Sequence, residues 1–224
     1  MMSTRDQLYP YANGEAFQNQ TTKAVFEDIY KQSSWNINTQ ESVSGEGSNL
    51  EQTATLRREL PEILNQLKVK SILDIPCGDF YWMSKVSLDH VAYTGADIVT
   101  ELVKQNQTTY GKEGRQFIEK NLLEDLLPKV DLIFCRDCLV HFSIADVYKA
   151  IANIKKSGAQ YLMSTHFTQE DENKDIVTGG WRPLNFCLHP FNFPKPLALL
   201  NENCSEMEGA FQDKCMAVWR VAEL

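Results

Sequence analysis

The stretch SILDIPCGDF, residues 71–80, decides the fold of this chain. Its first half is a short, mostly apolar run, which is typical of a strand buried in a sheet. The Pro76-Cys77-Gly78-Asp79 segment that follows is typical of a turn. Four later segments also have strand character: VAYTGAD (91–97), RQFIEKN (115–121), VDLIFCRD (130–137) and AQYLMSTHF (159–167).

Helical patterns lie between several of these strands. Residues 98–111 form one, and residues 143–158 form another, with Ser143 as the expected cap and Gly158 as the stop. Two further strands are expected in the tail, over 203–209 and 214–224, joined by a short turn. Alternating strands and helices predict a parallel sheet covered on both faces. We therefore predict an α/β fold with a doubly wound, Rossmann-like, seven-stranded sheet whose last strand is antiparallel.

The only shift in composition that suggests a boundary lies near residue 67. We predict that residues 1–66 are an N-terminal helical extension that caps a cofactor, and that residues 67–224 are one compact domain. Residues 33–49 are polar and rich in Gly and Ser, as expected of a loop. A helix is expected from about residue 50 to 67, capped by Ser48 or Asn49 and kinked or broken at Pro61.

Composition excludes several classes of function. The 224 residues are 43% hydrophobic, which excludes a disordered chain, and the net charge is −8. An acidic chain is a poor binder of nucleic acid or of an anionic membrane. No apolar run of about 18 residues is present, and the polar N-terminus predicts a cytoplasmic protein. Six cysteines, including the pair Cys135 and Cys138, are expected to be free thiols without a metal.

Residues at the carboxyl ends of the strands are candidates for a ligand site, because ligands of open α/β sheets bind there. They are Asp74, Gly78 and Asp79 after the first strand, Asp97 and Ile98 after the second, Asn121 and Leu122 after the third, Arg136 and Asp137 after the fourth, and His166 in the fifth. Asp97 lies 23 residues after Asp74, a spacing that suits an acid bound to the hydroxyls of a ribose.

The turn after the first strand indicates which nucleoside binds. Dinucleotide folds need three glycines so that the backbone can approach a pyrophosphate, but this turn has Gly78 alone. Asp79 would also place negative charge beside a phosphate. Both features disfavour NAD, FAD and ATP and allow a nucleoside without phosphates. S-adenosylmethionine is such a ligand.

The series LDIPCGDFYWM, GADI and DLIFCRDCLVHF resembles the motifs of class I S-adenosylmethionine-dependent methyltransferases over residues 67–167. The resemblance implies S-adenosylmethionine as cofactor. It places the methionine moiety near Asp74 and Gly78, the ribose at Asp97 beside Ile98, and the adenine between Asn121 and Leu122, with Arg136 as a further contact. Pro76 and Phe80 stand where the family often has glycine. Asp79 could contact the cofactor or cap the following turn, and residues 80–82 could cradle the sulfonium or pack in the core.

Further segments resemble a narrower bacterial and viral subgroup found among glycan-modifying enzymes. They are Trp35 with SGEGS (44–48), Thr53 and Arg57, then GWRPLN (180–185) and PFNFPKP (190–196). Residues 44–48 could form a backbone nest for a carboxylate, and Arg57 could add a charged hydrogen bond. We therefore expect Trp35, Gly45, Ser48 and Arg57 to contact the cofactor. The alternative is a plain surface loop.

Transfer of a methyl group needs alignment above all, and an alcohol acceptor also benefits from a general base. His141, Asp137 and His166 are the candidates, each with a purely structural role as the alternative. Trp181, Arg182 and Asn185 could line an acceptor pocket or pack as a lid. We expect no metal. The predicted function is methylation of a hydroxyl on a small polar acceptor such as a sugar or glycan residue.

Two other functions stay open at this stage. One is an NAD(P)-dependent oxidoreductase on a related fold, against which the missing glycines argue. The other is a non-catalytic module that binds S-adenosylmethionine, which the sequence does not exclude because methyl transfer does not demand one essential side chain. Neither the acceptor nor the oligomeric state follows from the sequence.

Overall fold

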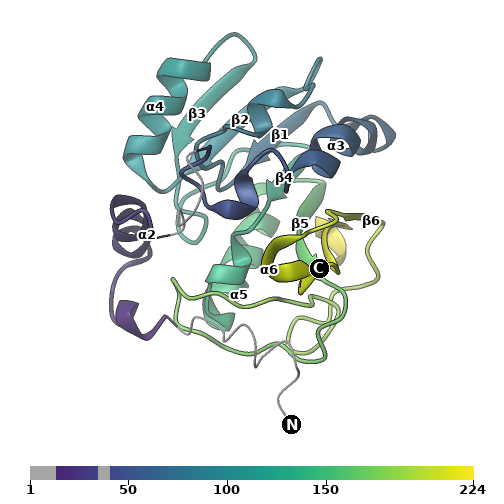
Figure 1. Ribbon diagram of the computed structural model, residues 1–224. Coiled ribbons are helices and arrows are strands. Elements are labelled where there is room, and N and C mark those ends of the chain that lie inside the picture. The colour runs from purple at the N-terminus through teal and green to yellow at the C-terminus, as the bar shows by residue number, and fades with distance from the viewer. Residues whose placement is uncertain (1–13, 35–40) are drawn as a thin grey trace.

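The central sheet has seven strands and belongs to a computed structural model that describes residues 14–34 and 41–224 (Figure 1). The strands are β1 (Ser71–Asp74), β2 (Ala92–Asp97), β3 (Arg115–Glu119), β4 (Leu132–Cys135), β5 (Tyr161–Phe167), β6 (Ala198–Asn201) and β7 (Lys214–Arg220). Their order across the sheet is β3-β2-β1-β4-β5-β7-β6.

β1 and β4 are neighbours in the middle of the sheet. From β1 the strand order runs to β2 and β3 on one side, and from β4 it runs to β5 on the other side, so the order reverses between β1 and β4. The pairs β1–β2, β1–β4, β2–β3 and β4–β5 are parallel. β7 runs antiparallel to both β5 and β6. The predicted doubly wound sheet with an antiparallel last strand is therefore confirmed, and the reversal leaves a crevice above the carboxyl ends of β1 and β4.

The longer helices are α2 (Thr22–Lys31), α3 (Ala54–Gln66), α4 (Thr100–Tyr110) and α5 (Ile144–Ser157), and a short α6 spans Glu206–Gly209. α4 and α5 begin and end close to the predicted ranges 98–111 and 143–158. At α5 the Ser143 side chain accepts the N–H of Asp146, and Gly158 ends the helix in the left-handed region at φ 72°. Both end signals of this helix are confirmed.

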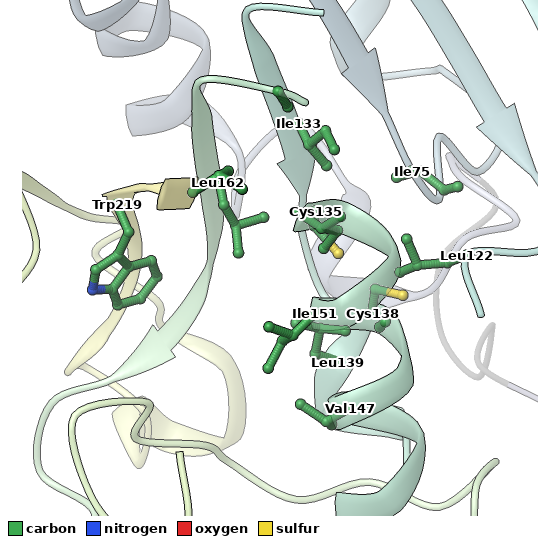
Figure 2. Close-up of a cluster of buried hydrophobic side chains, with 14 of the residues drawn as sticks. Ile75, Leu122, Ile133, Cys135, Cys138, Leu139, Val147, Ile151, Leu162 and Trp219 are labelled. Carbon is green, nitrogen blue, oxygen red and sulfur yellow. The ribbon is translucent and has the colours of Figure 1, made fainter. Parts of the chain in front are cut away.

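The side chains of each inner strand alternate between two apolar layers. Ile133 and Cys135 of β4 belong to the cluster that contains α5, together with Leu162 and Trp219 (Figure 2). Leu132 and Phe134 of β4 belong instead to the cluster on the opposite face, which contains Leu56, Leu60 and Leu64 of α3. The sheet is thus buried on both faces, which fixes its register because a slip of one residue would exchange the two layers.

Two local expectations, a break at Pro61 and a helix start near residue 50, are wrong. α3 continues without a break through Pro61, because Leu60 and Leu64 on either side are buried in the core and outweigh one lost backbone hydrogen bond. α3 also begins at Ala54, and Asn49 instead caps the turn ahead of it by accepting the N–H of Gln52 at 2.8 Å.

The sixth strand lies earlier in the chain than predicted. Residues 203–209 cannot extend, because Asn203, Met207 and Glu208 all have positive φ, between 50° and 56°. The strand is instead the short run Ala198–Asn201, whose Leu200 is buried in the core. The sequence 203–209 forms a loop and α6 above β7.

The described part of the chain contains no helix that is both long enough and apolar enough to span a bilayer. All six cysteines are free thiols, as expected.

Truncation of the α3 face tests its place in the main core. Leu60 is fully buried, so Leu60→Ala should lower the free energy of unfolding by roughly 2–5 kcal/mol. Leu126 is 78% exposed, so Leu126→Ala is a matched control that should change it by less than about 0.5 kcal/mol. Urea unfolding followed by circular dichroism measures both. Equal effects of the two changes would contradict the packing of α3 on the sheet.

Candidate active site

A pocket lies in the crevice above the carboxyl ends of β1, β2 and β4, between these strand ends and α2. Its floor consists of the turns after the three strands, and its cover consists of α2 and the loop at residues 43–48. It is lined by Thr22, Phe26, Ile29, Tyr30, Val43, Ser44, Ser48, Asp74, Ile75, Pro76, Cys77, Gly78, Asp79, Trp82, Asp97, Ile98, Val99, Leu102, Lys120, Asn121, Leu122, Phe134, Arg136, Asp137, Cys138, His141 and Phe142.

Gly78 occupies the tightest position of the β1 turn. Its φ is 53°, and a Cβ atom there would lie 2.2 Å from Ser44 Oγ. A side chain is therefore excluded both by backbone strain and by the loop above it. Asn106 of α4 fixes the same turn by donating its Nδ2–H to the Gly78 carbonyl at 2.7 Å.

Asp79 ties the β1 turn to the N-terminal loop. Its Oδ2 accepts the N–H of Val43 at 2.9 Å, and its own N–H donates to Ser44 Oγ at 2.9 Å. Its Oδ1 accepts the N–H of Tyr81 at 3.0 Å, so Asp79 also caps the turn that follows. The capping role is present, and the side chain lines the pocket as well.

Asp97, at the end of β2, is buried and lines the pocket next to Gly78. Its Oδ2 accepts the N–H of Gly78 at 3.1 Å, and its Oδ1 accepts the N–H of Val99 at 2.9 Å. The N–H of Ile98 is a third backbone group that stabilises this carboxylate, which retains capacity to accept a hydrogen bond from a ligand.

The two strand-end acids share a desolvated environment. Burial raises the pKa of Asp74 to about 7, although a hydrogen bond from the Tyr93 hydroxyl opposes the shift. Burial likewise raises the pKa of Asp97 to about 6, against the stabilising N–H groups of Val99 and Gly78. Perturbed acids in a crevice are a common feature of functional sites.

Part of the pocket lining is apolar. Ile98, Leu122 and Phe142 belong to this part, and the ring of Phe26 lies 5.8 Å from that of Phe142. Asn121 also lines the pocket, and its Oδ1 accepts the N–H of Leu123 at 3.0 Å. An aromatic base between apolar side chains fits this part, with Asn121 as a polar contact.

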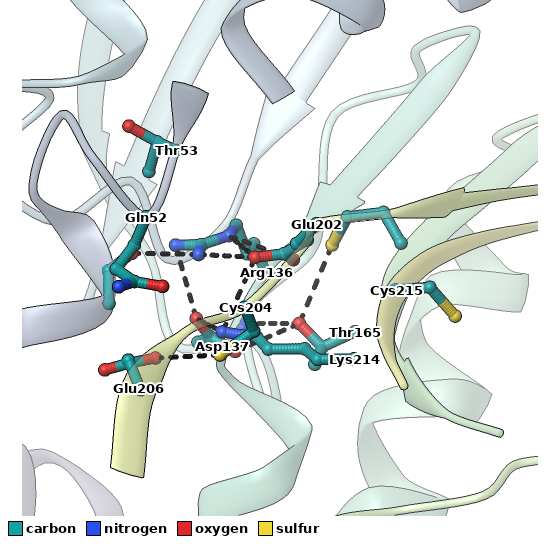
Figure 3. Close-up of polar contacts among 12 residues, drawn as sticks. Gln52, Thr53, Arg136, Asp137, Thr165, Glu202, Cys204, Glu206, Lys214 and Cys215 are labelled. Carbon is teal, nitrogen blue, oxygen red and sulfur yellow. Dashed lines mark hydrogen bonds and ion pairs between the residues drawn. The ribbon is translucent and has the colours of Figure 1, made fainter. Parts of the chain in front are cut away.

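A buried ion network surrounds the lining residues Arg136 and Asp137 (Figure 3). Arg136 binds Glu202 of the β6–α6 loop through Nη2 at 2.7 Å and donates to the Gly47 carbonyl at 2.9 Å. Asp137 pairs with Lys214 of β7 at 2.7 Å and with Arg136 at 3.2 Å. Burial disfavours its charge, but Lys214 and Arg136 outweigh burial and hold the pKa of Asp137 well below its usual range.

His141 lies beside this network, at the end of the 3-10 turn η4 (Leu139–His141). Its Nδ1 lies 2.8 Å from the Gly180 carbonyl oxygen. Because a carbonyl oxygen only accepts, Nδ1 carries the hydrogen and the basic lone pair is on Nε2. Burial lowers the pKa of His141 to about 4, so the ring is neutral near pH 7.

Several predicted site residues do not reach the pocket, which corrects those predictions. His166 is buried in β5, where its Nδ1 accepts the N–H of Phe186 and its ring packs against Trp219, so it is structural. Arg57 points along α3 and donates to the Leu50 carbonyl at 2.8 Å. Gly45 stands between the lining residues Ser44 and Ser48 but does not line the pocket itself.

Trp35 lies outside the described residues. The aromatic run divides: Trp82 lines the pocket, whereas Phe80 packs with Tyr93 and Phe117 in the core. The predicted acceptor residues Trp181, Arg182 and Asn185 also do not line the pocket.

Sequence reasoning missed the pocket face of α2 and the partners of Arg136. Thr22, Phe26 and Ile29 recur at helical spacing, so the periodicity was a usable signal, but nothing in it indicated a ligand-facing side. Glu202 and Lys214 are far from Arg136 in sequence, and no local pattern links them. Within residues 14–34 and 41–224, no group of three or more His, Cys, Asp and Glu side chains is arranged to hold a metal.

No protein-family model matches this chain, and no curated protein matches it. Solved structures do match. The N-methyltransferase NodS from Bradyrhizobium japonicum WM9, in complex with S-adenosyl-L-homocysteine, aligns with a TM-score of 0.59 at 14% identity, over 86% of this chain and 97% of that chain.

Two other matches have similar values. The 1,6-didemethyltoxoflavin-N1-methyltransferase of Burkholderia thailandensis, with bound S-adenosylhomocysteine, has a TM-score of 0.59 at 14% identity over 88% of this chain and 87% of that chain. Magnesium protoporphyrin IX methyltransferase from Synechocystis PCC 6803, with bound SAM, has a TM-score of 0.57 at 12% identity over 90% and 97%. At this identity the likeness shows the fold: the chain has the α/β fold of S-adenosylmethionine-dependent methyltransferases.

The raised pKa of Asp74 predicts a pH-dependent cost of folding. In the unfolded chain an Asp ionises near pH 3.9, whereas burial raises the pKa of Asp74 to about 7. The folded state therefore binds more protons between these values, and stability falls as pH rises from about 4 to 7. Asp74→Asn removes this cost and should stabilise the protein at pH 8 by on the order of 4 kcal/mol, with a smaller gain at pH 5.

Urea unfolding at the two pH values measures this difference. Asp89→Asn, at an exposed position, is the control and should change stability little at either pH. A protein with Asp74→Asn that is less stable than the wild type at pH 8 would show that the Asp74 charge supports the fold.

Proposed function

We propose that this protein is an S-adenosylmethionine-dependent methyltransferase that acts on a hydroxyl of a small polar acceptor such as a sugar or glycan residue. The observation that carries the proposal is that the backbone N–H groups of the turn after β1 already have hydrogen-bond acceptors. The N–H groups of Gly78 and Asp79 donate to Asp97 Oδ2 and Ser44 Oγ, and three carboxylates line the pocket beside this turn.

This turn fits an adenosyl group without phosphates. A dinucleotide or nucleotide site needs unoccupied backbone N–H groups to receive phosphate oxygens. Here a carboxylate and a serine hydroxyl already accept those hydrogens, and Asp79 would repel a phosphate. The arrangement argues against an NAD(P)-dependent oxidoreductase.

Residues along the pocket fit the parts of the cofactor in order. Asp97 retains capacity to accept a hydrogen bond from the ribose, and Ile98, Asn121 and Leu122 line the part of the pocket where the adenine would lie. Gly78 and Asp74 line the pocket beside Asp97, where the methionine moiety would lie. When bound, S-adenosylmethionine supplies a methyl group already activated on a sulfonium sulfur.

The N-terminal segment would close the pocket. α2 contributes Phe26, Ile29 and Tyr30 to the lining, and Ser44 and Ser48 line it from the loop. The predicted role of residues 1–66 as a cap is supported by these contacts, although α3 also belongs to the main core. A cytoplasmic location is part of the proposal and is supported by the six free thiols.

Asp137 and His141 would act on the acceptor in different ways. Asp137 is held ionised by Lys214 and Arg136, so it is suited to accept a hydrogen bond from the acceptor and not to take its proton. His141 is neutral near pH 7 and has its basic nitrogen at Nε2, so it is suited to remove the proton of a hydroxyl as the methyl group arrives.

Cofactor binding tests the proposed use of Asp97. Loss of charge-assisted hydrogen bonding to the ribose should weaken binding of S-adenosylhomocysteine by 10- to 100-fold in Asp97→Ala, or roughly 1.5–3 kcal/mol. Isothermal titration calorimetry measures this, with Asp89→Ala as the exposed control and NADH as the competing ligand. Unchanged affinity in Asp97→Ala, or binding of NADH in preference, would refute the site.

Turnover tests the role of His141. A mass-shift screen with sugars, glycans and amines identifies an acceptor, and His141→Gln should then lower kcat by roughly 10²–10⁴-fold, since a general base contributes about that much. Affinity for S-adenosylhomocysteine should stay within about twofold, because His141 acts on the acceptor. Full activity of the variant would make His141 structural, and methylation of amines alone would replace the hydroxyl acceptor.

A further inference from the structure

The segment at residues 179–182 runs along the turn that carries His141. The N–H of Gly179 donates to the His141 carbonyl at 2.8 Å, and the N–H of Arg182 donates to the Val140 carbonyl at 3.1 Å. Between these two bonds, the Gly180 carbonyl receives the Nδ1–H of the His141 ring at 2.8 Å. Backbone and ring of His141 are thus held by the same few residues, which lie about forty positions later in the chain.

The side chain of Arg182 also binds the η4 turn. The residue is 1% exposed, and its guanidinium donates to three backbone carbonyls on two segments. Nη1 binds the Leu139 carbonyl at 3.0 Å, Nη2 binds the Phe142 carbonyl at 2.6 Å, and Nε binds the Lys174 carbonyl at 3.0 Å. Leu139 and Phe142 flank His141, so Arg182 spans the whole η4 turn.

This use of a buried charge is costly. Carbonyl groups carry only partial charges, so they compensate a buried cation less well than a carboxylate does. Burial lowers the pKa of Arg182 to about 10, which still leaves it charged near pH 7. The planar guanidinium presents five N–H donors in fixed directions, so it can bind three carbonyls at once, and a lysine ammonium on its flexible stem cannot copy that geometry.

We propose that Arg182 is a positioning residue that holds the η4 turn against Gly180 and thereby fixes the orientation and the Nδ1–H tautomer of His141. The proposal rests on the assignment of His141 as the base under the proposed function. It gives the GWRPLN segment a role that differs from acceptor binding: the segment supports the base and does not line the pocket.

The positive charge of Arg182, like its hydrogen bonds, favours the neutral ring of His141. Burial is the largest influence on the pKa of His141, and among the described residues Asp137, Arg182 and Lys214 are charged groups that also shift it. Arg182 and Lys214 disfavour the imidazolium, whereas Asp137 and the Gly180 carbonyl favour it. Removal of Arg182 would remove one positive charge, and a looser turn would relieve burial, the largest influence; both effects raise the pKa of His141 and outweigh a weakened hydrogen bond to Gly180, which lowers it.

Nuclear magnetic resonance of the ¹⁵N-labelled full chain tests the proposal without cofactor or acceptor. Long-range ¹H–¹⁵N spectra report which ring nitrogen of each histidine carries the hydrogen, and His141→Gln identifies the signals of His141. In the wild type, His141 should keep the Nδ1–H tautomer from about pH 6 to 8. In Arg182→Met the tautomers should mix, and the pKa of His141 should rise by roughly one pH unit.

Two further variants make the outcome decisive. Arg182→Lys keeps the charge but reaches fewer carbonyls, so it should mix the tautomers to a smaller extent, and it carries the test if Arg182→Met does not fold. Arg115→Lys, at a half-buried arginine that packs over the Phe80 ring, controls for general loss of stability and should leave His141 unchanged.

Wild-type tautomer and pKa in folded Arg182→Met, or a wild-type tautomer in Arg182→Lys where the methionine variant fails to fold, would overturn the proposal. Because the ring is observed in the protein alone, absence of S-adenosylhomocysteine binding would reject the proposed function separately from this result.

Discussion

The hydrogen bonds of the β1 turn are the constraint on which the site depends. Gly78 and Asp79 direct their N–H groups to Asp97 and to Ser44, so one turn joins the end of β2 and the N-terminal loop. Gly78 is held at positive φ with Ser44 directly above it, so no other residue fits there. The same bonds shape the pocket, fix the orientation of the Asp97 carboxylate and occupy the backbone N–H groups that a phosphate would need.

The sheet could be predicted from sequence because burial on both faces leaves a strong local signal. Each inner strand is a short apolar run, and the cap and stop of α5 were visible as Ser143 and Gly158. Where local signals compete with tertiary packing, prediction fails. Pro61 is accommodated because its neighbours are buried, and β6 escaped notice because a four-residue edge strand with exposed Leu199 carries little pattern.

The site was predictable to the extent that topology determines it. Acids at strand ends, such as Asp97, must lie at the crevice once the strands are parallel. Side-chain direction does not follow from position in this way: His166 also stands on a strand but faces Trp219 in the core. Contacts between distant segments could not be predicted from the sequence. They set the protonation of the candidate side chains, since Lys214 keeps Asp137 ionised and Gly180 sets the tautomer of His141.

A crystal structure of the protein grown with both S-adenosylhomocysteine and NADH in excess tests the central claim most directly. We predict electron density for the adenosyl compound alone, with its ribose hydroxyls on the Asp97 carboxylate, its adenine beside Leu122 and the Gly78 turn unchanged. Density for a diphosphate against Gly78, or an adenosyl group bound away from Asp97, would contradict the assignment of this crevice to a nucleoside without phosphates.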